Sequence, residues 1–320
     1  MCIRDSARGC ADGSKQRKEP GYKKENAASP TVHNDSTFIT CAIDAKEGRD
    51  VMVVDLPGAF LHALRRAGGT KKQLLMVLRG PLAETMVLLD PTLYRPFITY
   101  DKNGVAVLYV EMDKALYGLL ESALDFYLKL SGELKEKGYK INPYDPCVAN
   151  KTIKGAQHTV IWHVDDLKCS HVDPFVNTLF AKWLSSIYGR NIRVKRGKRH
   201  DYLGVDFDWS EPGKCKVSMI KYMAQIIADF PEKIDKTATT GGGDNLYKIR
   251  DPDDPNLPQD FYLPEQLAQA FHHTLAQLLF ASQRPRRDLQ PYVSFLSKRV
   301  KKPDRDDWGK MKRLLQYLKG

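Results

Sequence analysis

Three aspartates stand where short apolar runs end. Asp55 closes the β-branched run Val51–Asp55 and precedes a Pro-Gly turn, whereas Asp165 and Asp166 lie between the two apolar runs of residues 158–170 (HTVIWHVDDLKCS). Adjacent carboxylates beside an apolar core repel each other, so they need a cation or solvent to relieve the repulsion. Mg²⁺ is the natural partner, because it takes hard oxygen ligands and keeps waters and substrate phosphates in its shell.

Three carboxylates that share two Mg²⁺ ions could carry out phosphoryl transfer. One ion would lower the pKa of an attacking 3′-hydroxyl, and the other would hold the leaving pyrophosphate. Because this reaction depends mostly on positioning and charge stabilisation, carboxylates suffice for the protein's share of the metal site. The alternative is structural: Asp is common in turns, and for Asp55 taken alone a turn before Pro-Gly is the favoured interpretation.

The residues around these aspartates predict short strands and amphipathic helices. The run at 51–55 and both halves of 158–170 predict buried strands, Tyr202–Trp209 predicts another short β element, and the turn at 101–104 predicts a hairpin. Apolar residues at helical spacing predict helices at about 35–47, 119–137 and 217–229.

A Gly-, Pro- and Asp-rich segment at 236–262 separates regions of different character. We expect residues 1–6 to be an arbitrary or disordered start, 7–235 to form the main domain, 236–262 to be a linker and 263–320 to be helical. The expected fold class is α+β, with an antiparallel sheet and packed helices followed by a helical region.

The charge of the chain favours a polyanionic partner. Fifty Lys and Arg against 39 Asp and Glu give a formal net charge of +11, and basic residues cluster at 15–24, 193–199, 298–302 and 310–313. Such clusters suit a sugar-phosphate backbone. No apolar run approaches the roughly 18 residues that span a bilayer, and no signal peptide is evident, so we expect a soluble intracellular protein without a membrane partner. The six cysteines lack Cys-x-x-Cys spacing, which indicates reduced thiols.

Several segments, in order along the chain, resemble copia-type retrotransposon reverse transcriptases, which are parts of a Pol polyprotein. The central match is HVDDL at 163–167, which is similar to the family's Tyr-Val-Asp-Asp box. Near the N-terminus, Arg8, Gly13 and Gln16 have the spacing of the family's fingers motif. The other matching segments are SPTV (29–32), VVDLPGAFLHA (53–63), DKALYGLLESALDFY (113–127), NPYDPCVANK (142–151), YLGVDF (202–207), QRPRRDL (283–289) and RLLQYLKG (313–320).

The resemblance implies a right-hand polymerase with palm and N-terminally truncated fingers, followed by a helical thumb and connection region. It implies an RNA-directed DNA polymerase that uses two Mg²⁺ ions, or Mn²⁺ in their place. The implied partners are an RNA template, a DNA primer or RNA–DNA duplex, and deoxynucleoside triphosphates, in the cytoplasm or in virus-like particles.

The resemblance also implies a role for individual residues. Asp55, Asp165 and Asp166 would be catalytic and would hold the metals. Arg8, Gly58, Ala59, Phe60, Tyr117 and Gly118 would bind the nucleotide, with Phe60 excluding a 2′-hydroxyl. His163, Leu203 and Gly204 would bind the primer.

The chain departs from the family pattern at particular positions. His163 replaces the usual Tyr, and residues 119–126 lack the expected Lys and Pro. Lys195 or Lys198 could protonate pyrophosphate as a general acid, although a solvated basic loop is favoured there. Two rival functions follow. One is a nucleic-acid-binding remnant of the same fold without catalysis, and the other is an unrelated metal-dependent phosphohydrolase, which would not need Phe60, Leu203 and Gly204.

Overall fold

The structure, a computed structural model, describes residues 10–18, 23, 27–65, 74–251, 254–258 and 260–320. The chain divides into two compact units, Met1–Gly197 and Lys198–Gly320. The first unit contains the three aspartates and most of the strands, and the second contains most of the C-terminal helices.

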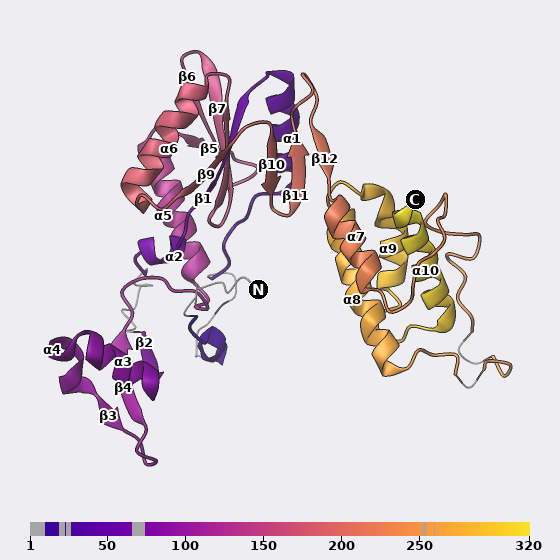
Figure 1. The fold of residues 1–320 in the computed structure, drawn as a ribbon, viewed down its shortest axis with the longest axis horizontal. Coiled ribbons are helices and arrows are strands. Elements are labelled where there is room, and N and C mark those ends of the chain that lie inside the picture. The colour runs from indigo at the N-terminus through magenta and orange to yellow at the C-terminus, as the bar shows by residue number, and fades with distance from the viewer. Residues whose placement is uncertain (1–9, 19–22, 24–26, 66–73, 252–253, 259) are drawn as a thin grey trace. The chain divides into compact units, whose positions relative to one another are not determined.

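A six-stranded antiparallel sheet forms the centre of the first unit, in the order β5-β6-β7-β8-β1-β9 (Figure 1). Strands β1 and β8 are buried at nearly every position, because helices cover both faces of the sheet. The strands are β1 (Asp50–Asp55), β5 (Lys140–Ile141), β6 (Val148–Ile153), β7 (Ala156–His163), β8 (Asp166–His171) and β9 (Arg193–Arg196).

Side-chain alternation along the strands shows which helix covers which face. Lys168 of β8 bonds Asp44 of α1 (Asn34–Lys46), so α1 lies on the face to which Lys168 points. His158 of β7 points to the other face, where it bonds Asn177 of α6 (Pro174–Tyr188). Helix α5 (Ser122–Glu136) joins α6 on that face, where Tyr127 stacks on Trp162.

Helix α5 begins later than its apolar spacing predicts. The expected start was about residue 119, but the helix starts at Ser122. The Ser122 hydroxyl donates to the Leu116 carbonyl at 2.7 Å and accepts from the Leu116 N–H at 3.1 Å. These two bonds hold residues 116–121 in a loop, which has consequences for the candidate site.

A smaller three-stranded sheet, β2 (Leu75–Arg79), β4 (Ala106–Glu111) and β3 (Thr99–Tyr100), belongs to the same unit (Figure 1). Helices α3 (Pro81–Leu89) and α4 (Pro91–Tyr94) accompany it. Leu78, Ala83 and Leu108 contribute to its core. The predicted hairpin turn is confirmed: the Asp101 carboxylate accepts from the N–H groups of Asn103 and Val105.

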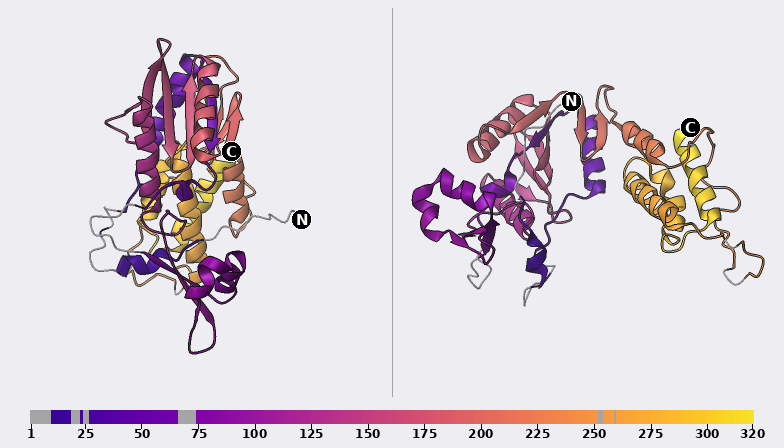
Figure 2. Two further views of the ribbon diagram at one scale, coloured as in Figure 1. Left: turned by 90° about the vertical axis from the view of Figure 1, so that its left-hand side faces the viewer. Right: turned by 60° about the horizontal axis from the view of Figure 1, so that its bottom comes forward.

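The second unit joins a three-stranded sheet to a helical bundle. The strands are β10 (Arg199–Tyr202), β11 (Val205–Asp208) and β12 (Lys216–Ser218), in that order. Four helices form the bundle, shown in Figure 2 (right): α7 (Ile220–Asp229), α8 (Glu265–Ser282), α9 (Gln290–Ser297) and α10 (Arg305–Lys319). The helix expected from 217 begins at Ile220, because residues 216–218 pair with β11 as a strand.

The segment 236–262, expected to be a linker, falls within the second of the two units, which begins at Lys198, and the described part of the segment contacts the helices of that unit. The side chains of Leu246 and Phe261 are buried. The Ala238 N–H donates to the Gln316 carbonyl at 3.1 Å, and Lys310 Nζ donates to the Lys248 carbonyl at 2.7 Å. A few apolar anchors and hydrogen bonds therefore fix a segment whose composition is typical of a loop.

At the level of architecture, the chain combines α-helices with antiparallel sheets, as the α+β class requires. In the part of the chain that the structure describes, no helix has both the length and the apolar character that a membrane span needs.

Candidate active site

Strand register brings four polar side chains into one row across the large sheet. His163 of β7 pairs with Asp166 of β8, Asp166 pairs with Asp55 of β1, and Asp55 pairs with Arg193 of β9. Residues paired in this way point to the same face, with Cβ atoms ~4.5–5.5 Å apart. Asp166 lies two residues from Lys168, so the row is on the α1 face of the sheet.

Asp165 lies beside this row, in the two-residue connection between β7 and β8. Its carbonyl accepts from the N–H of Leu56, the residue after Asp55, at 3.1 Å. Val164, the other connecting residue, has φ of 57°, a left-handed conformation that a β-branched side chain rarely adopts. Such a conformation costs on the order of 1–3 kcal/mol, and strain of this kind concentrates at functional sites.

The Asp55 carboxylate has a cationic neighbour. Arg193 Nη1 lies 3.5 Å from Asp55 Oδ2, and the two side chains are 75% and 35% exposed. Solvent screens a pair this exposed, so its contribution to stability is at most about 1 kcal/mol. The guanidinium nevertheless places a positive charge at the site where a metal ion would be needed.

The three carboxylates match the donor chemistry of Mg²⁺, but their side chains do not yet form a ligand cluster. Their backbones are adjacent, as the pairing of Asp55 with Asp166 and the bond from Leu56 to Asp165 show. Among the described residues, no group of three or more His, Cys, Asp or Glu side chains is arranged to hold a metal ion.

The Pro-Gly turn after Asp55 leads into α2 (Ala59–His62). Gly58 caps this short helix with φ of 69°, a conformation that favours glycine. The Ala59 N–H, expected to help bind a triphosphate, donates instead to the Leu56 carbonyl at 3.2 Å. Phe60 is half-buried, with its ring centroid 4.5 Å from that of Tyr117 and 6.3 Å from that of Phe126. The structure thus brings together Phe60 and Tyr117, two residues expected at the nucleotide.

Gly118 lies in tight contact with the N-terminal segment. The Ala11 N–H donates to the Tyr117 carbonyl at 2.7 Å, and a Cβ at Gly118 would lie 1.9 Å from the Ala11 carbonyl oxygen. Gln16 Oε1 accepts from the Leu120 N–H at 3.0 Å. The segment around residues 11–16 and the loop at 117–120 therefore form one structure that needs glycine at 118. Arg8, expected to contact the triphosphate, lies outside the described residues.

The expected primer-binding residues fall in both units. His163 is in the carboxylate row, whereas Leu203 and Gly204 form the turn between β10 and β11 in the second unit. Both have positive φ (53° and 74°), as a type I′ hairpin turn requires. A Cβ at Gly204 would lie 3.8 Å from the Phe280 ring of α8, so this turn packs against the bundle.

The sequence did not indicate the roles of two further residues, one at the site and one at the start of α1. Arg193 was noticed only as a member of the basic run 193–199, since nothing in the run indicates that it pairs with Asp55. Asp145, from the segment 142–151, is buried and accepts from the N–H groups of His33 and Cys147 at 2.9 and 3.0 Å. It fixes the start of α1 against the sheet, a structural role that its position between two prolines did not indicate.

The candidate general acids differ in position. Lys195 pairs with Val53, two residue pairs along β9 from the partners Arg193 and Asp55, and therefore lies on the same face as the carboxylates. Its side chain is exposed. Lys198 begins the second unit.

Comparison with known proteins indicates the class to which this chain is related. No protein-family model matches the chain. It is 23% identical over 322 residues to the retrovirus-related Pol polyprotein from transposon TNT 1-94 of Nicotiana tabacum, an alignment that covers 99% of this chain. The chain spans 22% of the length of that polyprotein. It is thus similar to one segment of a retrotransposon Pol polyprotein.

Solved structures include two telomerases with a distant likeness. Apo telomerase from Candida tropicalis has a TM-score of 0.39 and 10% identity, covering 90% of this chain and 47% of that chain. Telomerase from Candida albicans, in complex with the TWJ fragment of telomeric RNA, has a TM-score of 0.30 and 11% identity, covering 95% and 51%. These scores are too low for the chains to be compared element by element.

Proposed function

We propose that this chain is the polymerase core of a copia-type reverse transcriptase. It adds deoxynucleotides to the 3′ end of a primer, as directed by an RNA or DNA template. The observation that carries the proposal is the cross-strand row, in which Asp55 faces Asp166 while the Asp165 backbone is bonded to Leu56. The same chain is similar to a segment of a retrotransposon Pol polyprotein.

In this proposal, Asp55, Asp165 and Asp166 hold two Mg²⁺ ions, for which Mn²⁺ can substitute. When bound, the ions supply activation of the primer 3′-hydroxyl and stabilisation of the leaving pyrophosphate. His163 of β7 pairs with Asp166 of β8, and its imidazole would hydrogen-bond the primer backbone. Lys195, which is exposed on the same face as Asp55, would be the group that protonates the leaving pyrophosphate.

In this proposal, Phe60 and Tyr117 form the wall of the nucleotide pocket. The Phe60 ring is held against Tyr117, and Tyr117 belongs to the loop that Gly118 and Ala11 fix in place. A rigid ring at this position leaves room for a deoxyribose but not for a 2′-hydroxyl. In the turn before α2, the Gly58 N–H would be the backbone donor to the triphosphate, since the Ala59 N–H bonds the Leu56 carbonyl.

The subdomains follow from the same proposal. The six-stranded sheet with α1, α5 and α6 is the palm, and the small sheet with α3 and α4 belongs to the fingers. The strands and helices of the second unit provide the primer-gripping hairpin, the thumb and the connection region. The partners are RNA template, DNA primer or RNA–DNA duplex, and deoxynucleoside triphosphates.

One observation favours a second candidate, a nucleic-acid-binding remnant of the same fold. Arg193 Nη1 lies 3.5 Å from the carboxylate of Asp55, and among the described residues no group of three acidic side chains is arranged to hold a metal ion. A chain that kept this arrangement permanently would bind duplexes through its basic surface without extending a primer.

Primer extension and duplex binding, measured side by side on the same preparation, separate these candidates. The substrate is a labelled DNA primer on an RNA template, with Mg²⁺ and deoxynucleotides, and EDTA provides the control. The proposal predicts Mg²⁺-dependent, template-directed extension, with binding whose log K falls linearly with log salt as counterions are released. Tight, salt-sensitive binding without extension would establish the second candidate, the nucleic-acid-binding remnant. A binding constant that does not change with salt concentration would contradict both candidates.

A further inference from the structure

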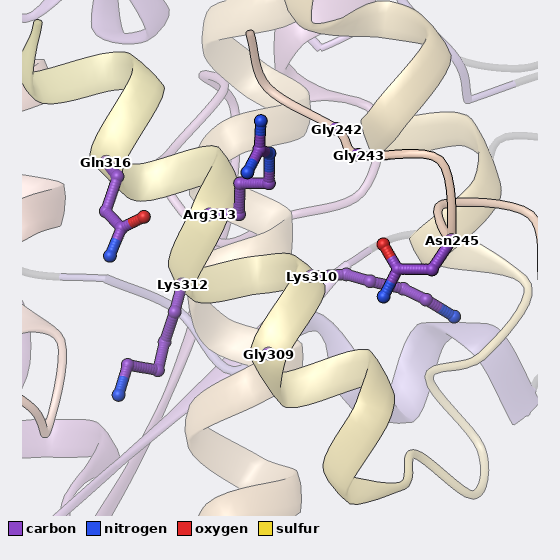
Figure 3. A pocket seen from close by; sticks show the side chains of 8 residues that line it. All are labelled: Gly242, Gly243, Asn245, Gly309, Lys310, Lys312, Arg313 and Gln316. Carbon is purple, nitrogen blue, oxygen red and sulfur yellow. The ribbon is translucent and has the colours of Figure 1, made fainter. Parts of the chain in front are cut away.

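The second unit contains a polar cavity that the polymerase reaction does not use. It has a volume of about 420 Å³ and lies between the loop at 241–245 and helix α10 (Figure 3). The loop contributes Gly242, Gly243 and Asn245, and α10 contributes basic residues and Gln316. Figure 3 shows Arg313 projecting from α10 toward the two glycines.

The glycines hold the loop backbone close to its neighbours. A Cβ at Gly241 would lie 2.7 Å from the Tyr292 ring and 2.8 Å from Leu314, and a Cβ at Gly242 would lie 2.9 Å from the same ring. Bulkier residues would push the loop away from the bundle. The Thr240 hydroxyl also donates to the Gly242 carbonyl at 2.9 Å, which fixes the wall of the cavity.

Three cations of α10 line the cavity, and their surroundings differ. Lys310 is buried and lies 3.6 Å from the Asp307 carboxylate, so its charge is balanced. Lys312 forms an ion pair with Glu232, and this pairing lowers the pKa of Glu232. Arg313 is exposed, and its Nη2 donates to a neutral group, the Thr240 hydroxyl, at 3.1 Å.

Arg313 therefore supplies the positive charge that the cavity presents to a ligand. Among the residues that the structure describes, no carboxylate lies within 4.0 Å of its guanidinium. An arginine fork with remaining N–H donors matches a phosphate group. The side-chain amides of Asn245 and Gln316 offer further donors beside it.

We propose that this cavity binds a phosphate of a nucleic-acid backbone. The lining is made of glycines, amides and cations, without an aromatic or apolar side chain on which a base could stack. A free nucleotide would gain little from such a site, since its base would stay in water. A strand whose phosphate enters the cavity keeps its bases outside, so binding is independent of sequence.

The site involves no catalytic residue and extends the proposed function without depending on it. Duplex binding in EDTA, followed by fluorescence anisotropy over a salt series, tests it with Arg313→Gln. The matched control is Lys233→Gln, which removes one charge from the same unit, where Lys233 is 87% exposed and paired with Asp235 at 3.0 Å. Arg313→Gln should weaken duplex binding by about fivefold to tenfold and reduce the slope of log K against log salt by roughly one, whereas the control changes little.

A second variant keeps the inference testable if Arg313→Gln disturbs folding. Asn245→Asp preserves the shape of an exposed loop residue and places a negative charge on the cavity wall, so it should weaken binding in the same direction. Binding by both variants equal to that of Lys233→Gln would overturn the inference. So would competition by dATP or inorganic phosphate at concentrations as low as those of an unlabelled duplex. If the parent extends no primer but Arg313→Gln still weakens binding, the polymerase proposal fails and this site stands.

Discussion

The neighbours of Asp55 are set by the register in which β1 pairs with β8 and β9. The three aspartates could be found from the sequence, because each follows or precedes an apolar run and two are adjacent. That Asp55 and Asp166 face each other depends on the pairing of β1 with β8, and that Arg193 joins them depends on the pairing with β9. These are contacts between residues more than 100 positions apart, which local spacing does not encode.

The aromatic pair at the site was only partly predictable. Phe60 and Tyr117 were each identified through a family resemblance, but the 4.5 Å approach of their rings depends on the loop at 116–121. That loop exists because the Ser122 side chain bonds both backbone groups of Leu116. Helical periodicity instead extended the helix through part of this loop.

Phe60 should act as a steric gate for the sugar of the incoming nucleotide. We expect Phe60→Ala to raise the ratio of ribonucleotide to deoxynucleotide incorporation by more than the ~10–200-fold effect of one missing methylene, because steric overlap is repulsive. The ring is half-buried, so the free energy of unfolding should fall by ~2–3 kcal/mol, below the full cost of a buried Phe. The ratio is measured in single-nucleotide extension assays on folded variants.

Phe175→Ala is the matched control, since Phe175 is 56% exposed at the start of α6. It should leave the sugar preference unchanged. The same preference in Phe60→Ala and the parent would make Phe60 a packing residue alone.

At the scale of elements, the sequence predicts the presence of strands and helices better than it predicts the residues at which they begin and end. The strands β1, β7 and β8 and the helix α1 lie within a few residues of their predicted positions. The errors occur where a tertiary contact overrides periodicity, as at β12, which pairs with β11 instead of starting a helix. The buried side chains of Leu246 and Phe261 are another case, because these apolar residues lie in a segment rich in Gly, Pro and Asp.

The contact between β7 and α6 makes stability depend on pH. His158 is fully buried, its Nε2 lies 3.0 Å from Asn177 Oδ1, and burial lowers its pKa to about 4. In the unfolded chain the pKa is about 6.5, so the unfolded state takes up the proton first. Stability is therefore greatest above pH ~6.5 and is lost as the pH falls toward the folded pKa.

For His158, we expect this effect to lower the free energy of unfolding by about 2 kcal/mol between pH 7 and pH 5. Urea unfolding at the two pH values measures it. The difference should shrink by that amount in His158→Gln and persist in His273→Gln, whose side chain is exposed on α8. Equal pH dependence in all three proteins would mean that His158 does not titrate in this range.

At the scale of the whole molecule, the sequence predicted the order of β-rich and helical regions and the basic charge. It did not predict that the second unit begins at Lys198 or that it contains the cavity beside Arg313. The cavity depends on how residues 238–248 pack against α10, where Ala238 bonds Gln316 and Lys310 bonds Lys248. A composition typical of linkers conceals such packing, because glycines also allow a backbone to approach a ring closely, as Gly241 and Gly242 approach Tyr292.

Template-directed extension by Asp165→Asn tests most directly whether the carboxylate row is the active site of a polymerase. The amide keeps the shape of the side chain but loses the charge that would bind Mg²⁺, so the fold should persist while the extension rate falls by at least on the order of a hundredfold. Glu136→Gln, the same chemical change at an exposed position on α5, should extend at the parental rate. Extension by Asp165→Asn at a near-parental rate would contradict the assignment of Asp55, Asp165 and Asp166 as the metal-binding residues.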